Sequence, residues 1–292
     1  MYKLIANISN KNTLSSKSDP HTSMLSSSNI KLINSLRQKK YRERENLFVI
    51  EGDKLVSEYL ASGRQVKLLL AVSEWIAKKD KTLLSRAKEI ITVSEKEIAK
   101  VSQLTTPQGI LAVANMERYQ PDLASLTEKL SIALDDVQDP GNLGTIIRLA
   151  AWFGIEHILC SRGTVDLYNP KTVQSSMGAF LHVKVSYTDL AVTFSQLSES
   201  KLPVYAATLD GEQVHKINKT QHGLLLFGNE ARGITAELLP YVTQKISIPP
   251  YRKALPGIDS LNVAMSAAII CNEFRRKGGQ RTKSPKTKAH SK

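Results

Sequence analysis

Three short segments carry polar side chains at points where strand-like runs end, and the first of them is DPGNLGTIIRLAAWFG. It holds Asn142 and, six residues later, Arg148. Six residues make nearly two helical turns, so both side chains would lie close to one face of a helix. Arg148 lies in an otherwise apolar run, where a charged group must reach solvent, pair with an acid or serve a site. The two residues could orient a polar substrate, although a structural ion pair at Arg148 explains the pattern as well.

The other two segments are LLLFGNEARGI and ISIPP with the DSLNVAMSAA that follows it. Gly228, Asn229 and Glu230 come directly after an apolar run, which is where open parallel sheets bind their ligands. Ser260 and Asn262 come at the start of a helix, where both residue types also serve as N-caps. Gly228 alone could be a turn residue. Because all three segments combine asparagine with glycine or proline at a strand end, together they predict a binding site.

The glycines at positions 141 and 144 suggest at first a loop that binds a dinucleotide. That fingerprint needs Gly-x-Gly-x-x-Gly and an acidic residue about 20 positions later, at the end of the next strand. The spacing here is Gly-x-x-Gly, and the next strand ends at Cys160 and Ser161. The sequence also lacks the Gly-Lys-Ser/Thr of a phosphate-binding loop. Both kinds of nucleotide loop are therefore excluded.

The elements that position these residues are predicted to alternate between strands and helices along the chain. Residues 131–277 alternate short strands with helices, and strands that are apolar on both faces predict a parallel sheet covered by helices. Residues 30–115 read as a smaller α/β unit. Its features include a helix over residues 30–40 and a capping box in SEKE at residues 94–97. We therefore expect an α/β fold with two units.

The segments outside these two units are polar. Residues 116–130 are predicted to be a linker between the units. Residues 1–29 are rich in serine and residues 278–292 are rich in lysine, so both are predicted to be disordered. Either Met1 or Met24 could be the natural start.

The net charge of +13 is concentrated near the ends of the chain. Residues 275–292 hold eight lysines or arginines and no acid, and residues 31–46 hold six against two acids. Clustered basic residues are typical of proteins that bind a polyanion, although a solvated tail explains the C-terminal run equally well. In the cluster over residues 31–46 the predicted contacts are Arg37, Lys39, Lys40 and Arg42.

Other features limit the class of protein. Cys160 and Cys271 are the two cysteines, too few for a disulfide framework and suited to a reducing compartment. The six histidines show no zinc-ligand spacing, so we expect no metal. No apolar run is long enough to span a bilayer. We expect a cytoplasmic protein without a membrane partner.

The three segments, together with NPKTVQSSMGAF between them, resemble the signature motifs of the SpoU (TrmH-type) RNA ribose 2'-O-methyltransferases of the SPOUT superfamily. The resemblance covers residues 132–277. The earlier QKKYRERENLFVIEG and TTPQGILAVA are similar to the L30e-like substrate-binding domain of ribosomal RNA members. The resemblance to the SpoU-type enzymes implies a parallel sheet with a trefoil knot, bound S-adenosylmethionine, and a homodimer with active sites at the interface. The glycines at 141 and 144 would then allow a tight turn at that interface.

The resemblance also implies roles for residues of this chain. The cofactor would be held by Gly228, Ile248 and Leu261, with Leu226 and Asn229 beside them. The catalytic set would be Asn142, Arg148, Glu230, Ser260 and Asn262. It leaves open whether Arg148 acts as a base or as an electrostatic clamp. Because a guanidinium is effectively always protonated, we favour a clamp on a neighbouring phosphate and on the developing alkoxide.

The substrate implied by the N-terminal unit is 23S ribosomal RNA. A transfer RNA substrate and a non-catalytic RNA-binding protein are the alternatives, and the resemblance does not separate guanosine from uridine. Methylation of a base is a weaker alternative, because such SPOUT members do not usually combine NxGxxxR with SLNVA.

The loop between Ile248 and Ser260 is longer than is usual in the family and carries Arg252 and Lys253. We expect both side chains to contact RNA phosphates. An Arg252→Ala, Lys253→Ala double substitution should therefore weaken RNA binding and reduce its salt dependence by about two charges. A titration of RNA at several salt concentrations measures this, and unchanged affinity would contradict the contact.

Overall fold

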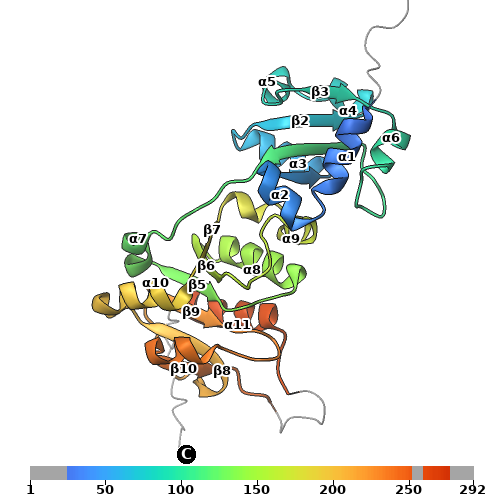
Figure 1. The fold of residues 1–292 in the computed structure, drawn as a ribbon. Helices are drawn as coiled ribbons and strands as arrows, with labels where there is room; N and C mark the ends of the chain where they lie inside the picture. Colours follow the sequence, from blue (N-terminus) through green and yellow to red (C-terminus); the bar gives the residue numbers. More distant parts are fainter. Residues whose placement is uncertain (1–24, 252–258, 277–292) are drawn as a thin grey trace, which may run out of the picture.

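The computed structural model describes residues 25–251 and 259–276. Figure 1 shows two α/β units one above the other, each built on its own sheet, with the chain crossing once between them after β4 (Ile110–Asn115). Of the ends predicted to be disordered, residues 1–24 and 278–292 lie outside the described residues, as does the 252–258 segment. Residues 25–29 are described and differ from that prediction, because Leu25 is buried and the helix α1 (Ser27–Ser35) begins here. In the described part of the chain, no helix is long and apolar enough to cross a membrane.

The first sheet has the strand order β1-β4-β2-β3. Strand β4 runs antiparallel to both of its neighbours, and β2 and β3 are parallel. Its other strands are β1 (Leu47–Glu51), β2 (Val66–Ala71) and β3 (Ile90–Thr92). The helices around it are α1 (Ser27–Ser35), α2 (Lys39–Glu45), α3 (Asp53–Ala61), α4 (Ser73–Ala77), α5 (Lys81–Leu84) and α6 (Glu95–Ala99).

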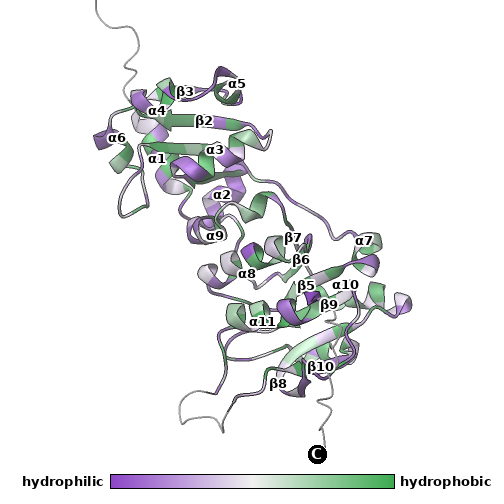
Figure 2. Ribbon diagram, turned by 180° about the vertical axis from the view of Figure 1, so that it is seen from behind, coloured by the Kyte–Doolittle hydropathy of each residue, from purple (hydrophilic) through white to green (hydrophobic). Residues whose placement is uncertain are grey.

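In the first unit, the predicted capping box is present and the predicted first helix is divided into two. The capping box at Ser94 and Glu97 is confirmed at the start of α6. The single helix predicted over residues 30–40 is wrong, because α1 ends at Ser35 and α2 begins at Lys39. Leu36 is fully buried in the core while Gln38 has extended backbone angles, so the chain turns between the two helices. Figure 2 shows the contrast between the mainly hydrophobic β2 and the mainly hydrophilic α2.

The second sheet has the order β10-β8-β9-β5-β6-β7, and all of its paired strands are parallel. The predicted parallel sheet is therefore confirmed. Its strands are β5 (Leu130–Leu134), β6 (His157–Ser161), β7 (Lys184–Thr188), β8 (Val204–Gln213), β9 (Gly223–Phe227) and β10 (Gln244–Ser247).

Helices cover both faces of this sheet. Helices α8 (Pro140–Trp152) and α11 (Val263–Arg275) share one core cluster, and α10 (Leu190–Leu197) belongs to a separate cluster with β8 and β9. The other helical segments are α7 (Leu123–Glu128), α9 (Pro170–Ser176), η1 (Ala179–Leu181), η2 (Ser198–Ser200) and η3 (Ala236–Tyr241). The stretch predicted as a linker thus contains α7, which begins because the Asp122 carboxylate accepts from the Ser125 N–H at 3.1 Å.

Gly141 and Gly144 do not form the tight turn expected of them. Both lie within α8, whose N-cap is Asp139 with Pro140 as the first helical residue. A side chain at Gly144 would approach the Thr172 carbonyl oxygen to 2.7 Å and collide with Ser175. Gly144 therefore lets α8 pack closely on α9 of the same chain, and that close approach explains the glycine.

A buried ion pair and an aromatic cluster join the two units. Arg42 is 2% exposed, and its Nη2 and Nε donate to Asp166 Oδ2 at 2.6 and 2.9 Å. Its Nη1 donates to two backbone carbonyls, those of Leu36 and Arg37. The ring of Phe48 in the first sheet packs 4.4 Å from that of Tyr168, centroid to centroid. Because removing one partner of a buried pair costs about 3–5 kcal/mol, this contact favours the observed orientation of the two units.

The position of Arg42 corrects one expectation. Arg42 was expected among the RNA contacts, but its guanidinium is enclosed between α2 and the segment that carries Asp166. The expectation arose because Arg42 lies in a run of basic residues. Its neighbours on α2, Lys39 and Lys40, are exposed. One charge of the basic cluster is thus used to join the two units.

Candidate active site

A cleft of 620 Å³ opens at the carboxyl ends of β9 and β10, beside the middle of β8. Its wall is made by these parts of the three strands and by the beginning of α11, which are far apart in sequence. The lining residues include Ala207–Leu209, Phe227–Ile234, Ile246–Ile248, Asp259–Leu261 and Val263. Two of the three segments singled out in the sequence therefore meet at this cleft, and its volume is within the usual range of small-molecule sites, about 300–1,000 Å³.

Of the five residues predicted to hold a cofactor, four line the cleft. They are Gly228, Asn229, Ile248 and Leu261. Leu226 is not among the lining residues, because it is fully buried in the core cluster shared with α10. It immediately precedes Phe227, which does line the cleft, and adjacent strand residues point to opposite faces of a sheet.

Gly228 occupies a position that needs glycine. A Cβ atom there would lie 2.5 Å from the Gly233 carbonyl oxygen and 2.5 Å from the Ile234 nitrogen. These distances are far below ordinary contact, so any side chain would push apart the loop that follows β9. The missing side chain therefore allows the backbone at residues 233 and 234 to pack directly against Gly228, and both residues line the cleft.

Thr208 and Leu209 were missed by the sequence analysis. Strand β8 pairs Ala206 with Lys245 but Glu212 with Ile246, so the residues between them bulge out of the ladder. The bulge brings Thr208 and Leu209 to the cleft wall. The Asp-Gly pair at 210–211 was the available signal, because a glycine within a strand pattern often marks a bulge.

A second group of side chains is joined by hydrogen bonds beside the cleft. The Asn142 Nδ2 donates to Glu230 Oε1 at 2.8 Å, and Asn142 Oδ1 accepts from Asn262 Nδ2 at 3.0 Å. The Asn262 Oδ1 in turn accepts from the N–H groups of Ala264 and Met265 at the start of α11. This chain of bonds joins one residue from each of the three segments.

The same contacts identify the helix cap. Asn262 is the N-cap of α11. The cap role considered for Ser260 is therefore wrong, because the chain enters the helix two residues later. Ser260 instead lines the cleft, as does Glu230.

Arg148 lies on the exposed side of α8. No ion pair to its guanidinium occurs within residues 25–251 and 259–276, so the structural alternative considered for it finds no support there. Trp152, one turn further along α8, is 83% exposed. Met265 and Ile269 are exposed on α11, which packs on α8. Arg148 therefore lies one helical turn from an exposed aromatic residue on α8, the helix on which α11 packs.

The remaining candidate residues lie in the first unit or outside the described chain. Arg37, Lys39 and Lys40 are exposed near α2. The Lys40 ammonium and the Arg44 guanidinium lie 4.8 and 4.9 Å from the ring centroid of Tyr41. Arg252 and Lys253 fall outside the described residues.

The described residues contain no group of three or more histidine, cysteine or acidic side chains that could hold a metal ion. Burial raises the pKa of the Cys271 thiol to about 12 and raises the pKa of Cys160 further. Because only a thiolate is an effective nucleophile, neither cysteine supplies one at neutral pH.

Sequence profiles match both units of the chain. The SpoU rRNA Methylase family matches residues 129–272, and the MRM3-like substrate binding domain matches residues 27–112. The chain is 34% identical over 241 residues to a 23S rRNA (guanosine-2'-O)-methyltransferase of Bacillus subtilis. That alignment covers 82% of this chain and 93% of the relative.

Solved structures agree with these matches. A TrmH-family protein of Porphyromonas gingivalis superposes with a TM-score of 0.75 at 35% identity, covering 87% of this chain and 99% of that chain. An rRNA methyltransferase of Sinorhizobium meliloti with bound AdoMet superposes with a TM-score of 0.74 at 30% identity, covering 87% and 97%.

Proposed function

This chain belongs to the SpoU rRNA methylase family and is an S-adenosylmethionine-dependent RNA ribose 2'-O-methyltransferase, and we propose that its substrate is a guanosine of 23S rRNA. The 34% identical relative from Bacillus subtilis is named for methylation of a 23S rRNA guanosine, which favours guanosine over uridine. The match of residues 27–112 to a substrate-binding domain supports an RNA-binding role for the first unit. The exposed Lys39 and Lys40 are its proposed phosphate contacts.

The observation that carries the proposal is the position of the hydrogen-bonded Asn142, Glu230 and Asn262 beside the cleft. Glycine at 228 lets loop backbone form the cleft wall, and this wall fits a ligand such as S-adenosylmethionine. When bound, S-adenosylmethionine supplies a methyl group already activated on a sulfonium. The protein therefore has mainly to position the ribose hydroxyl and to assist the loss of its proton.

We assign this positioning to the three joined side chains. Asn142 is held from both sides, so its carboxamide is oriented before substrate binds. Glu230 lines the cleft and also contacts Asn142, which connects the cofactor wall to the substrate side. Ser260 lies on the same wall. Pre-organised polar groups of this kind stabilise a transition state without the cost of reorientation.

We propose that Arg148 binds a phosphate of the RNA and stabilises the developing negative charge on the ribose oxygen. Its exposure and the absence of an ion-pair partner in the described chain leave the guanidinium available. A guanidinium keeps its proton at physiological pH, so it serves better as a clamp than as a base.

We also propose that the enzyme is a homodimer. Trp152, Met265 and Ile269 expose large apolar groups on two helices that pack on each other. Grouped apolar side chains at a surface mark interaction sites. Burial of this surface by a second copy would place Arg148 at the interface, as the family resemblance implies. We further propose that the C-terminal unit contains a trefoil knot and that residues 116–130 divide the chain into its two units.

We propose that catalysis needs no metal ion, since the methyl donor is already activated. We propose a cytoplasmic location, which suits the free thiols of Cys160 and Cys271.

The function is tested by cofactor binding and by mapping the modified nucleotide. Calorimetry with S-adenosylmethionine should show binding to the full chain. Ribosomal RNA from a strain lacking the protein should lose one 2'-O-methylguanosine of 23S rRNA, restored by the natural protein and not by Asn142→Ala. Absence of cofactor binding would favour a non-catalytic RNA-binding protein, and loss of a transfer RNA methyl group alone would overturn the substrate.

The clamp role of Arg148 is tested by Arg148→Lys. A lysine keeps the charge but loses the planar fork, so we expect kcat to fall by about 10²-fold while S-adenosylmethionine affinity is unchanged. Single-turnover methylation measures this. Arg118→Lys, at an exposed arginine between β4 and α7, is the matched control and should keep full activity. Retention of most turnover in Arg148→Lys would show the clamp role to be wrong.

The dimer surface is tested by Trp152→Glu. Because an ionised carboxylate is costly to bury in an apolar interface, we expect light scattering to give the mass of one chain for this variant and of two chains for the natural protein. Val192→Glu is the matched control, since Val192 is exposed on α10 at the other face of the sheet. A dimeric Trp152→Glu protein, or a monomeric natural protein, would contradict the proposed interface.

A further inference from the structure

The loop over residues 228–235 forms much of the wall of the cleft proposed to bind S-adenosylmethionine, here called the cofactor wall. Contacts from outside the loop support its shape. A pair of 2.9 Å backbone bonds closes it, from the Asn229 N–H to the Gly233 oxygen and from the Gly233 N–H to the Asn229 oxygen. The loop carries both Gly228 and Glu230 into the cleft. Any shift of this loop would therefore change the cofactor wall and the bond from Glu230 to Asn142 together.

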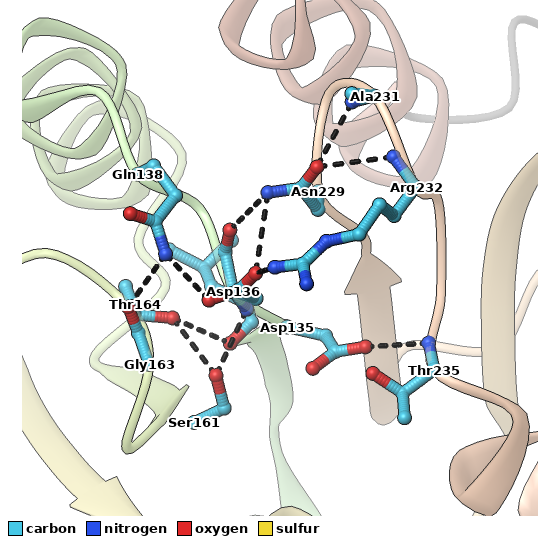
Figure 3. Close-up of polar contacts among 11 residues, drawn as sticks. Asp135, Asp136, Gln138, Ser161, Gly163, Thr164, Asn229, Ala231, Arg232 and Thr235 are labelled. Atoms are coloured by element: carbon cyan, nitrogen blue, oxygen red, sulfur yellow. Dashed lines mark hydrogen bonds and ion pairs between the residues drawn. The ribbon is translucent and has the colours of Figure 1, made fainter.

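Asp136 binds the loop near its beginning and at its middle (Figure 3). Its backbone oxygen accepts from Asn229 Nδ2 at 2.8 Å, and its Oδ2 accepts from the same nitrogen at 3.3 Å. The same Oδ2 accepts from the Arg232 guanidinium. Asn229 Oδ1 meanwhile accepts from the N–H groups of Ala231 and Arg232, so the Asn229 carboxamide is used inside the loop.

Asp135 binds the loop at its far end. Its Oδ2 accepts from the Thr235 N–H at 2.7 Å, and the side chain is 5% exposed. Two consecutive carboxylates that follow β5 thus hold the loop that follows β9 at its two ends. Strands β5 and β9 are paired in the sheet, so this contact spans neighbouring strand ends.

Asp136 is itself fixed by its surroundings. Its φ of +60° lies in the left-handed region that residues other than glycine, asparagine and aspartate seldom adopt. Its N–H donates to Ser161 Oγ at 2.8 Å, and its Oδ1 accepts from Gln138 Nε2 at 2.6 Å. Gly163 packs directly on this carboxylate, because a Cβ there would collide with Asp136 Oδ1. The carboxylate is therefore a rigid support for the loop.

We propose that Asp136 is a positioning residue of the methyl transfer, which holds the 228–235 loop in the shape that binds S-adenosylmethionine. This proposal rests on the proposed function. It assigns Asn229 to shaping the loop, since its amide is bonded to Asp136 and to loop backbone. It also gives Arg232, exposed at the cleft, a partner that fixes its position.

The test uses Asp136→Gly and Asp136→Asn in the full chain. Glycine and asparagine both tolerate the left-handed conformation, so each keeps the backbone while glycine removes the side chain and asparagine removes its charge. We expect calorimetry to show S-adenosylmethionine affinity reduced roughly tenfold in Asp136→Gly and less in Asp136→Asn, with a matching rise in the KM for S-adenosylmethionine. The KM for RNA should stay within about twofold.

A merely structural role would lower the unfolding midpoint and kcat without a selective rise in the KM for S-adenosylmethionine. Glu156→Gln is the matched control, because it removes the charge of an exposed pair with Lys129 beside the opposite ends of β5 and β6. If the natural protein binds S-adenosylmethionine and both Asp136 variants bind it equally well, the positioning role is wrong. If the natural protein does not bind it, the proposed function itself fails.

Discussion

The two hydrogen bonds of the Asn142 carboxamide join the three segments of the proposed active site. One bond reaches Glu230 in the loop after β9, and the other reaches Asn262 at the cap of α11. Asn142 itself lies in the first turn of α8, whose start is set by Asp139 and Pro140. Three helix or strand ends must therefore be placed to within hydrogen-bond distance before any of these side chains can act. The parallel sheet achieves this, because strands that run the same way end at the same edge.

Contacts away from that edge of the sheet hold α8, the loop after β9 and the start of α11 in place. Gly144 allows α8 to approach α9 closely, which fixes the axis of the helix that carries Asn142. Asp135 and Asp136 hold the loop that carries Glu230. Asn262 caps α11 and contacts Asn142 with the same side chain, so a residue that stabilises the helix also completes the site. Asn262 therefore has a structural role as a helix cap and, in the proposed mechanism, a second role at the active site.

The first unit is joined to this edge by a contact that uses part of its own basic cluster. Arg42 turns inward to Asp166 and to the end of α1, while Lys39 and Lys40 remain exposed. The buried pair and the packing of Phe48 on Tyr168 favour a fixed orientation of the two units. An RNA bound to the exposed basic residues would then meet the catalytic unit in a defined geometry.

The sequence by itself determined the alternation of strands and helices, the parallel sheet, the capping box at Ser94 and the three segments that contribute to the site. Periodicity and capping are local, so they are visible in short runs of residues. The sequence could not show that Arg42 is buried, that α1 and α2 are separate, or that Thr208 and Leu209 bulge into the cleft. It also could not show that Asn229 turns to Asp136. These outcomes depend on partners far along the chain, and only the tertiary structure decides which partner a side chain meets.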